Sequence, residues 1–409
     1  MIDAMQKQRE NLISNLKTIK TEKLNGECLE LVSEYQYLGI KLKPSGSCKS
    51  AADELYDKAS RAWFSISNIV HKNKRMDVDK IFGIFNSLVM PVATYGAPFW
   101  LPFTMPKKSF SDKSCCISNW ESFKCEQLQQ KCARMTLSLH RKSSRLAVIG
   151  ELGLYPLFIQ SVAQCLNYKL SLEKRMTNNH LINELMTDLQ TLSTAEHDSW
   201  LTRVNKVGLL FKIPNTIHYN KSSGKRIQNL LKSSFDRHFL EKLQETKIVE
   251  GSATNHNKLR TYQKFKSSFT REPYLDLTKN RNQRCHLSRI RVSSHSLRVE
   301  RGRYTCPPTP LDQRTCQYCT GVEGAARSEC APIDDEYHFI MNCEMFAQKR
   351  SELFITMSKL IKDFDIMSPT DKFKTLLCPV SARAVKLINR YVKQMFEARE
   401  DYDQNTYQV

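Results

Sequence analysis

The sequence predicts a mainly α-helical fold with a small β-structure near the N-terminus. Apolar residues recur every three or four positions over most of the chain, which is typical of amphipathic helices. Residues 27–43 instead have the aromatic and β-branched content of short strands, closed by turn residues. With 41% hydrophobic and 25% charged residues, the chain can form a buried core.

The N-terminal elements are expected in the order helix, hairpin, helix, helix. Residues 1–22 are predicted to form a polar, Lys-rich helix, and Tyr35–Leu42 has strand character before the turn residues 44–46. Apolar spacing then predicts helices at about 50–70 and 78–89, separated by a basic loop. The second should stop at Pro91, so that the two make an αα-hairpin.

The rest of the chain is expected to be helical with interruptions. The pattern predicts helices at about 120–140, 156–193, 227–243, 344–362 and 380–399, with Gly150, Gly153 and Pro156 punctuating the space before the second of these. Residues 305–333 are rich in cysteine and proline and predict irregular structure.

The chain is strongly basic, with a formal charge of +20 and a pI of about 9.3. Such a surplus favours a polyanionic partner, and nucleic acid is the preferred interpretation because phosphate contacts release counterions. An anionic membrane surface is the alternative. It is disfavoured because no run of ~18 apolar residues and no signal-like N-terminus is evident.

Fourteen cysteines are scattered without a signal peptide, which favours a reducing, intracellular compartment and mostly free thiols. One subset has ligand spacing: Cys316 and Cys319 form a CxxC pair, followed by His338 and Cys343. A Cys₃His set is a normal ligand group for one structural zinc ion, which stabilises a fold without activating water. The alternative is buried free cysteines and a surface histidine.

Neighbouring residues offer competing interpretations. Cys306 and Cys330 are further thiols that could replace a ligand, but neither has a partner at CxxC spacing. The acidic run 334–336 precedes His338 and is predicted to cap the following helix or to orient the histidine ring. A Mg²⁺-dependent polymerase site is disfavoured, because its carboxylates converge from separate strands. No catalytic residue is therefore predicted.

A basic stretch directly precedes the CxxC pair and is predicted to contact nucleic acid. Arginine suits bidentate phosphate contact, although a solvated helix face or salt bridges would give the same composition. Its seven arginines are Arg281, Arg284, Arg289, Arg291, Arg298, Arg301 and Arg303. Residues 94–100 are predicted to form an aromatic loop, which packs in a core or stacks on bases.

Several segments, taken in order, resemble one known family. EYQYLGIKLKPSGS, LYDKASRAWFSI and IFNSLVMPVATYGAPFW resemble the end of the palm and the thumb of non-LTR (LINE-like) retrotransposon reverse transcriptases, and VIGELGLYPL resembles the segment after the thumb. SRIRVSSHSLRVERGRY, RTCQYC and DDEYHFIMNCEMFAQKR resemble the C-terminal Cys/His knuckle of that family. The resemblance spans residues 24 to 400 approximately.

The resemblance implies five domains. These are a palm-end remnant with a β-hairpin (1–49), a thumb-like helical domain (50–140), a basic helical connector (141–300), a zinc-knuckle module (301–350) and a C-terminal helical tail (351–409). It also places zinc on Cys316, Cys319, His338 and Cys343, in agreement with the spacing. The interval between Cys319 and His338 is longer than is usual in the family.

Three functions fit this sequence. The preferred one is a non-catalytic protein that binds RNA, DNA or RNA–DNA hybrid through the thumb and knuckle, because the paired aspartates of the family's polymerase site are expected upstream of residue 1. The second is a piece of a full RNA-directed DNA polymerase whose N-terminal part was lost in gene prediction. The third is a transposon remnant without a selected function.

Overall fold

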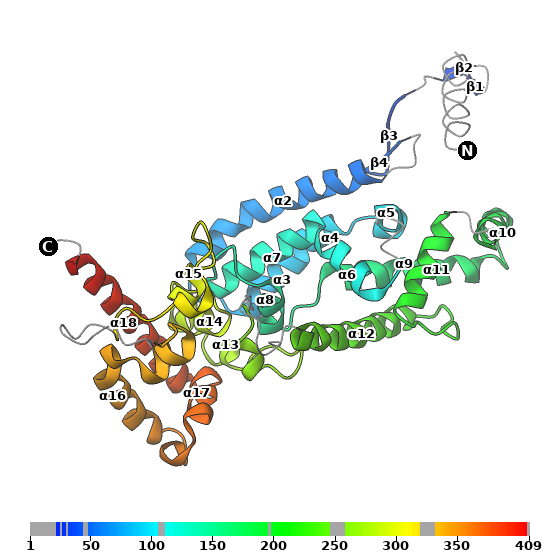
Figure 1. The fold of residues 1–409 in the computed structure, drawn as a ribbon. Helices are drawn as coiled ribbons and strands as arrows, with labels where there is room; N and C mark the ends of the chain where they lie inside the picture. The colour runs from blue at the N-terminus through cyan, green and yellow to red at the C-terminus, as the bar shows by residue number, and fades with distance from the viewer. Residues whose placement is uncertain are drawn as a thin grey trace.

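The computed structural model describes residues 22–406 except 25–26, 30–31, 44–47, 105–110, 195–197, 246–257 and 320–331. The fold is mainly α-helical, as predicted (Figure 1). The predicted helix at 1–22 lies almost wholly outside the described residues. The long helices are α2 (Lys49–Lys72), α7 (Lys124–Leu137), α9 (Leu157–Arg175), α10 (His180–Thr194), α11 (Trp200–Leu210), α12 (Ser223–Glu245), α16 (Ala347–Ser358) and α18 (Ala382–Thr406).

Shorter helices connect and cover these. They are α3 (Val78–Ile84), α4 (Met90–Ala93), α5 (Ala97–Thr104), α6 (Lys113–Glu121), α8 (Arg145–Leu152), α13 (Tyr274–Leu277), α14 (Cys285–Arg291), α15 (Arg298–Arg301) and α17 (Pro369–Leu377). Single turns of 3₁₀ or π helix are η1 (Phe85–Val89), η3 (Tyr262–Lys264), η4 (Arg281–Gln283), η5 (Leu311–Gln313), η6 (His338–Asn342), η7 (Glu344–Phe346) and η8 (Phe364–Ile366).

The predicted β-structure is two separate antiparallel hairpins. Strands β1 (Glu22–Leu24) and β2 (Glu27–Leu29) pair with each other, and β3 (Tyr35–Tyr37) pairs with β4 (Ile40–Leu42). The prediction of one strand over 35–42 is wrong. Leu38 and Gly39 have φ values of 47° and 80°, so the chain reverses in a two-residue turn that requires positive φ at both positions.

The predicted αα-hairpin is present, but its second arm is longer than expected. On α2, the buried side chains at 51, 55, 59, 63 and 70 follow the helical period. The second arm continues past Pro91 through α3, η1 and α4 to Ala93, so the prediction of a stop at Pro91 is wrong. Because proline has no N–H to donate, the wider turn at Phe85–Val89 accommodates it at the start of α4.

Residues 94–100 are not a loop. From Ala97 they belong to α5, where Trp100 is buried and donates its indole N–H to the carbonyl of Tyr95 over 2.7 Å. The alternative that the aromatic cluster packs in a core therefore holds for Trp100, whereas Tyr95 and Phe99 are about half exposed.

Two large apolar cores organise the molecule. The first joins α2, α3 and α7 with α14, α17 and α18. The second joins α5, α6, α9 and α12, on the opposite side of Figure 1 from the C-terminal helices. Because the first core runs from Ala59 to Met395, the predicted thumb-like region and the predicted C-terminal regions pack against the same interior. The five domain boundaries remain a prediction.

Within the part of the chain that the structure describes, no single helix is long and apolar enough to cross a membrane. Two bent helix pairs, Val78–Ala93 with Ala97–Thr104 and Arg145–Leu152 with Leu157–Arg175, have the length and composition together.

Candidate metal centre

The CxxC pair is positioned by a short β-bridge. Thr315 pairs antiparallel with Ile333, and the Cys316 amide donates to the carbonyl of Pro332 over 2.8 Å. The amide of Asp334 donates in turn to the carbonyl of Arg314 over 2.9 Å. These backbone bonds fix the strand that carries Cys316 beside the strand that leads to His338.

His338 and Cys343 are brought to one side by the π-helical turn η6. The amide of Cys343 donates to the carbonyl of His338 over 2.8 Å, five residues back, so the two side chains lie one wide turn apart. The carboxylate of Asp335 accepts from the amide of His338 over 2.7 Å at the start of the turn. The predicted capping role of the acidic run is thus confirmed at Asp335.

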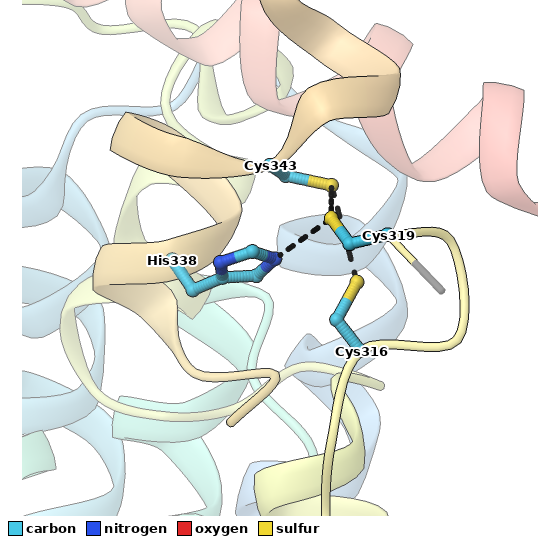
Figure 2. Close-up of side chains that lie close together, drawn as sticks. All are labelled: Cys316, Cys319, His338 and Cys343. Carbon is cyan, nitrogen blue, oxygen red and sulfur yellow. Dashed lines mark hydrogen bonds between the residues drawn. The ribbon is translucent and has the colours of Figure 1, made fainter. Parts of the chain in front are cut away.

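Four potential ligand atoms converge in this Cys/His cluster, which comprises Cys316, Cys319, His338 and Cys343 (Figure 2). All four atoms lie within 4.8 Å of one another. The Cys343 Sγ lies 4.0 Å from Cys316 Sγ and 3.7 Å from Cys319 Sγ, and Cys319 Sγ lies 3.4 Å from His338 Nε2. All three cysteines are free thiols, since these separations far exceed an S–S bond of about 2.05 Å. The cluster can hold one metal ion.

The electrostatics of the cluster favour a thiolate at Cys343. Hydrogen bonding from the Cys316 thiol, from His338 and from the Arg399 guanidinium lowers the pKa of Cys343 to about 3. The same contact with Cys343, together with burial, raises the pKa of Cys316. A metal needs deprotonated sulfur, so one ligand of the cluster is already predisposed to bind it.

Arg399 of α18 lies against two sulfur atoms of the cluster. One guanidinium nitrogen lies 3.6 Å from Cys316 Sγ and 3.7 Å from Cys343 Sγ, while another donates to the Asp334 carboxylate at 2.9 and 3.1 Å. The guanidinium also stacks against Tyr318, 4.4 Å from its ring centroid. Arg399 is only 5% exposed, so its charge is compensated by Asp334 and by any thiolate of the cluster.

Sequence reasoning missed Arg399. It follows Cys343 by 56 residues, and no local spacing links the two. It also lies on a helix whose other charged side chains are mostly exposed, so a solvated position was the natural expectation.

Glu336, the last acid of the run, belongs to a separate buried network. Its carboxylate accepts from Arg260 at 2.7 Å, from Ser293 at 2.7 Å and from Thr261 at 2.9 Å, and it pairs with His295 at 2.7 Å. These partners hold the pKa of Glu336 well below its usual range against the opposing effect of burial. The alternative in which the acidic run orients the His338 ring therefore does not apply to Glu336, because its oxygens are used elsewhere.

Three of the seven predicted nucleic-acid arginines lie in the interior. Arg281 donates to the carbonyls of Met135 and His71, and Arg284 donates to that of Thr278. Arg291 has no exposed surface and is bound by the carboxylates of two glutamates, Glu151 and Glu272.

The assignment of Arg281, Arg284 and Arg291 to phosphate contacts is corrected, because a phosphate cannot reach guanidinium groups that are enclosed by protein. In this part of the chain, the alternative of salt bridges and internal hydrogen bonds accounts for the composition. Sequence alone did not reveal it because the acids that pair with Arg291 lie on other elements.

The other four arginines are nearer the surface. Arg289 is half-buried and donates to the carbonyl of Ser138, and Arg303 donates to Glu300 over 3.1 Å. Arg298 is exposed and donates to the carbonyl of Thr315. Arg301 is exposed and forms no ion pair with the described residues. Contact of these four with nucleic acid remains a prediction.

Of the two spare thiols, only Cys306 lies within the described residues. Cys306 is exposed and is not among the four converging ligands. Cys330 lies outside the described residues.

Comparison with family models, with curated proteins and with solved structures found no match to this chain.

Proposed function

We propose that the chain is a zinc-stabilised nucleic-acid-binding protein of retrotransposon origin that does not itself polymerise nucleotides. The donor geometry of the Cys/His cluster carries the zinc part. Tetrahedral zinc with Zn–S distances of about 2.3 Å and a Zn–N distance of about 2.0 Å separates two sulfurs by about 3.8 Å, and a sulfur from a nitrogen by about 3.5 Å. In the protein, two Sγ–Sγ distances are 3.7 and 4.0 Å and one Sγ–Nε2 distance is 3.4 Å, and all four donor atoms lie within 4.8 Å of one another.

The proposed zinc has a structural role. Three thiolates and one imidazole fill a tetrahedral shell and leave no position for a water molecule or a substrate. Cys316 and Cys343 belong to the first apolar core, so the ion would tie the CxxC loop to the η6 turn within that core. Zinc binding is then coupled to folding of this part of the chain.

The nucleic-acid part of the proposal is supported by charge and by resemblance. Internal ion pairs do not lower the net charge of +20, because each arginine in them is matched by an acid. A surface with this surplus attracts a polyanion through phosphate contacts. The sequence segments that resemble non-LTR reverse transcriptases favour RNA, DNA or their hybrid as that polyanion.

The acidic run does not support polymerase chemistry. Asp334 pairs with Arg399, Asp335 caps a helical turn, and Glu336 is enclosed by its own donors. Carboxylates in these roles are not arranged to share two magnesium ions. The alternative of a fragment of a working polymerase predicts an in-frame palm with two aspartates in the upstream genomic DNA.

Equilibrium binding tests the proposed function. The purified protein is titrated against single-stranded RNA, duplex DNA and RNA–DNA hybrid at ~50 and ~200 mM salt. If about five phosphates are contacted, affinity should fall on the order of a hundredfold between the two salt concentrations. Binding that is nearly independent of salt would contradict the proposal. Primer extension with Mg²⁺ should give no product, and synthesis by this chain alone would contradict the non-catalytic part.

A further inference from the structure

A basic groove of roughly 630 Å³ lies beside the Glu336 network. Its walls come from the turn after α7, from the α14–α15 region and from α18, elements that lie close together in Figure 1. Four cationic side chains line it: Lys142, Lys258, Arg289 and Arg301. Only Arg289 and Arg301 belong to the arginine segment that the sequence singled out.

Tyr304 holds the two lysines at the groove. The Lys142 ammonium lies 3.9 Å from the Tyr304 ring centroid and the Lys258 ammonium lies 5.3 Å from it. Lys258 also donates to the carbonyl of Lys142 over 2.7 Å, which joins the two segments. Cation–π contacts thus fix two ammonium groups near one aromatic ring that is itself half exposed.

The positive charge of the groove is incompletely compensated. Its acids are Glu300 and Glu400. Glu300 is bound by Arg260 at 2.7 Å and by Arg303 at 3.1 Å, and lies 3.8 Å from Lys258. Its single charge is therefore shared among several cations. Lys142 forms no ion pair with the described residues, and neither do Arg289 and Arg301, which leaves these three cations available to a bound anion.

The Ser294 hydroxyl adds a neutral donor to the same surface, because its oxygen accepts two hydrogen bonds and its own proton is left to donate. The Ser143 hydroxyl donates to the Ser294 hydroxyl over 2.8 Å, and the Ser294 oxygen accepts from the His140 amide over 3.0 Å. Both serines line the groove. Phosphate oxygens are commonly bound by such a combination of lysine, arginine and serine.

We propose that this groove binds the sugar–phosphate backbone of a single nucleic-acid strand. The inference rests on the proposed function and names the site that performs it. A volume in the range of small-ligand pockets accommodates a short stretch of one strand rather than a duplex. A cationic groove beside an exposed aromatic ring is the usual arrangement for single-strand binding, with Tyr304 in contact with a base or sugar.

The test compares two double variants of equal charge change. Lys142→Gln/Arg301→Gln removes two exposed cations of the groove, and Arg383→Gln/Lys386→Gln removes two exposed cations of α18 that do not line it. Binding of a short single-stranded RNA is measured by fluorescence anisotropy. The groove variant should lose roughly twentyfold in affinity at about 0.1 M salt, and its salt slope should flatten by about 1.4. The α18 variant should lose much less.

The outcomes separate this inference from the proposed function. If the unmodified protein binds no nucleic acid, both are wrong. If it binds nucleic acid and the two variants weaken binding equally, the groove is not the binding site, whereas the proposed function is unaffected. A mononucleotide that displaces the RNA as effectively as an unlabelled strand would also overturn the strand assignment. Photocrosslinking of 5-iodouridine RNA to the unmodified protein should label the Tyr304 peptide, and labelling only elsewhere would overturn the site without reliance on any variant.

Discussion

Replacing Arg399 should destabilise the protein and weaken metal binding at once. In Arg399→Met, the Asp334 carboxylate loses its guanidinium partner although its side chain is only 1% exposed. It keeps one donor, the backbone amide of Arg298 at 2.9 Å. Removing one partner of a buried ion pair lowers the free energy of unfolding by about 3–5 kcal/mol. The remaining hydrogen bond from the Arg298 amide favours the lower end of this range. Loss of the contacts to Cys316 and Cys343 should reduce zinc affinity by roughly 10–100-fold.

Guanidinium unfolding and zinc competition with a chromogenic chelator measure the two effects. The control is Lys393→Met on the same helix, where both partners of the Lys393–Glu397 pair are more than half exposed, and it should change stability by about 1 kcal/mol or less. Asp334→Asn combined with Arg399→Met should recover part of the lost stability, because the buried Asp334 charge is then removed together with its partner. An Arg399→Met protein with unchanged stability and zinc affinity would refute the role of Arg399 in supporting the cluster.

Two further predictions concern the interior of the fold. Gly150→Ala should destabilise the protein by about 1–3 kcal/mol, because the added Cβ would lie 2.6 Å from the Phe239 ring. Gly83→Ala should instead stabilise it by about 0.5–1 kcal/mol, because Gly83 is an exposed position of α3 where the added Cβ meets nothing within 4 Å. Equal shifts in melting temperature for the two variants would contradict this. Burial raises the pKa of Glu126 to about 7 from 4.5, so its contribution to stability is complete below 4.5 and is lost as pH rises through about 7. Relative to Glu126→Gln, the unmodified protein should therefore lose up to about 3 kcal/mol between pH 4.5 and 8 in urea unfolding, and a constant difference would exclude a raised pKa.

The sequence predicted the helical class and the ligand set because both depend on local spacing. The period of four on α2 appears directly in the buried positions Ala51, Leu55 and Ala59. The CxxC pair and the later His338 and Cys343 converge as their spacing suggested, even though the intervening residues 320–331 are not described. Turn and bridge contacts that depend on a few neighbouring residues are the part of a site that a motif can encode.

The environment of the arginines could not be predicted, because it depends on long-range pairing. Arg291 and Arg301 lie in one basic stretch, yet the first is enclosed by Glu151 and Glu272 and the second is exposed. The composition of the stretch does not distinguish the buried arginine from the exposed one. The predicted helix stop at Pro91 failed for a related reason. The π turn that accommodates this proline is a backbone adjustment that no residue pattern indicates.

Zinc stoichiometry tests the central claim most directly. Native mass spectrometry of the purified protein should find about one zinc per chain. Cys343→Ser should lose the ion, whereas Cys306→Ser, at an exposed thiol outside the cluster, should retain it. Full zinc occupancy in Cys343→Ser, or none in the unmodified protein prepared with zinc present, would contradict the assignment of the Cys/His cluster as a structural metal centre.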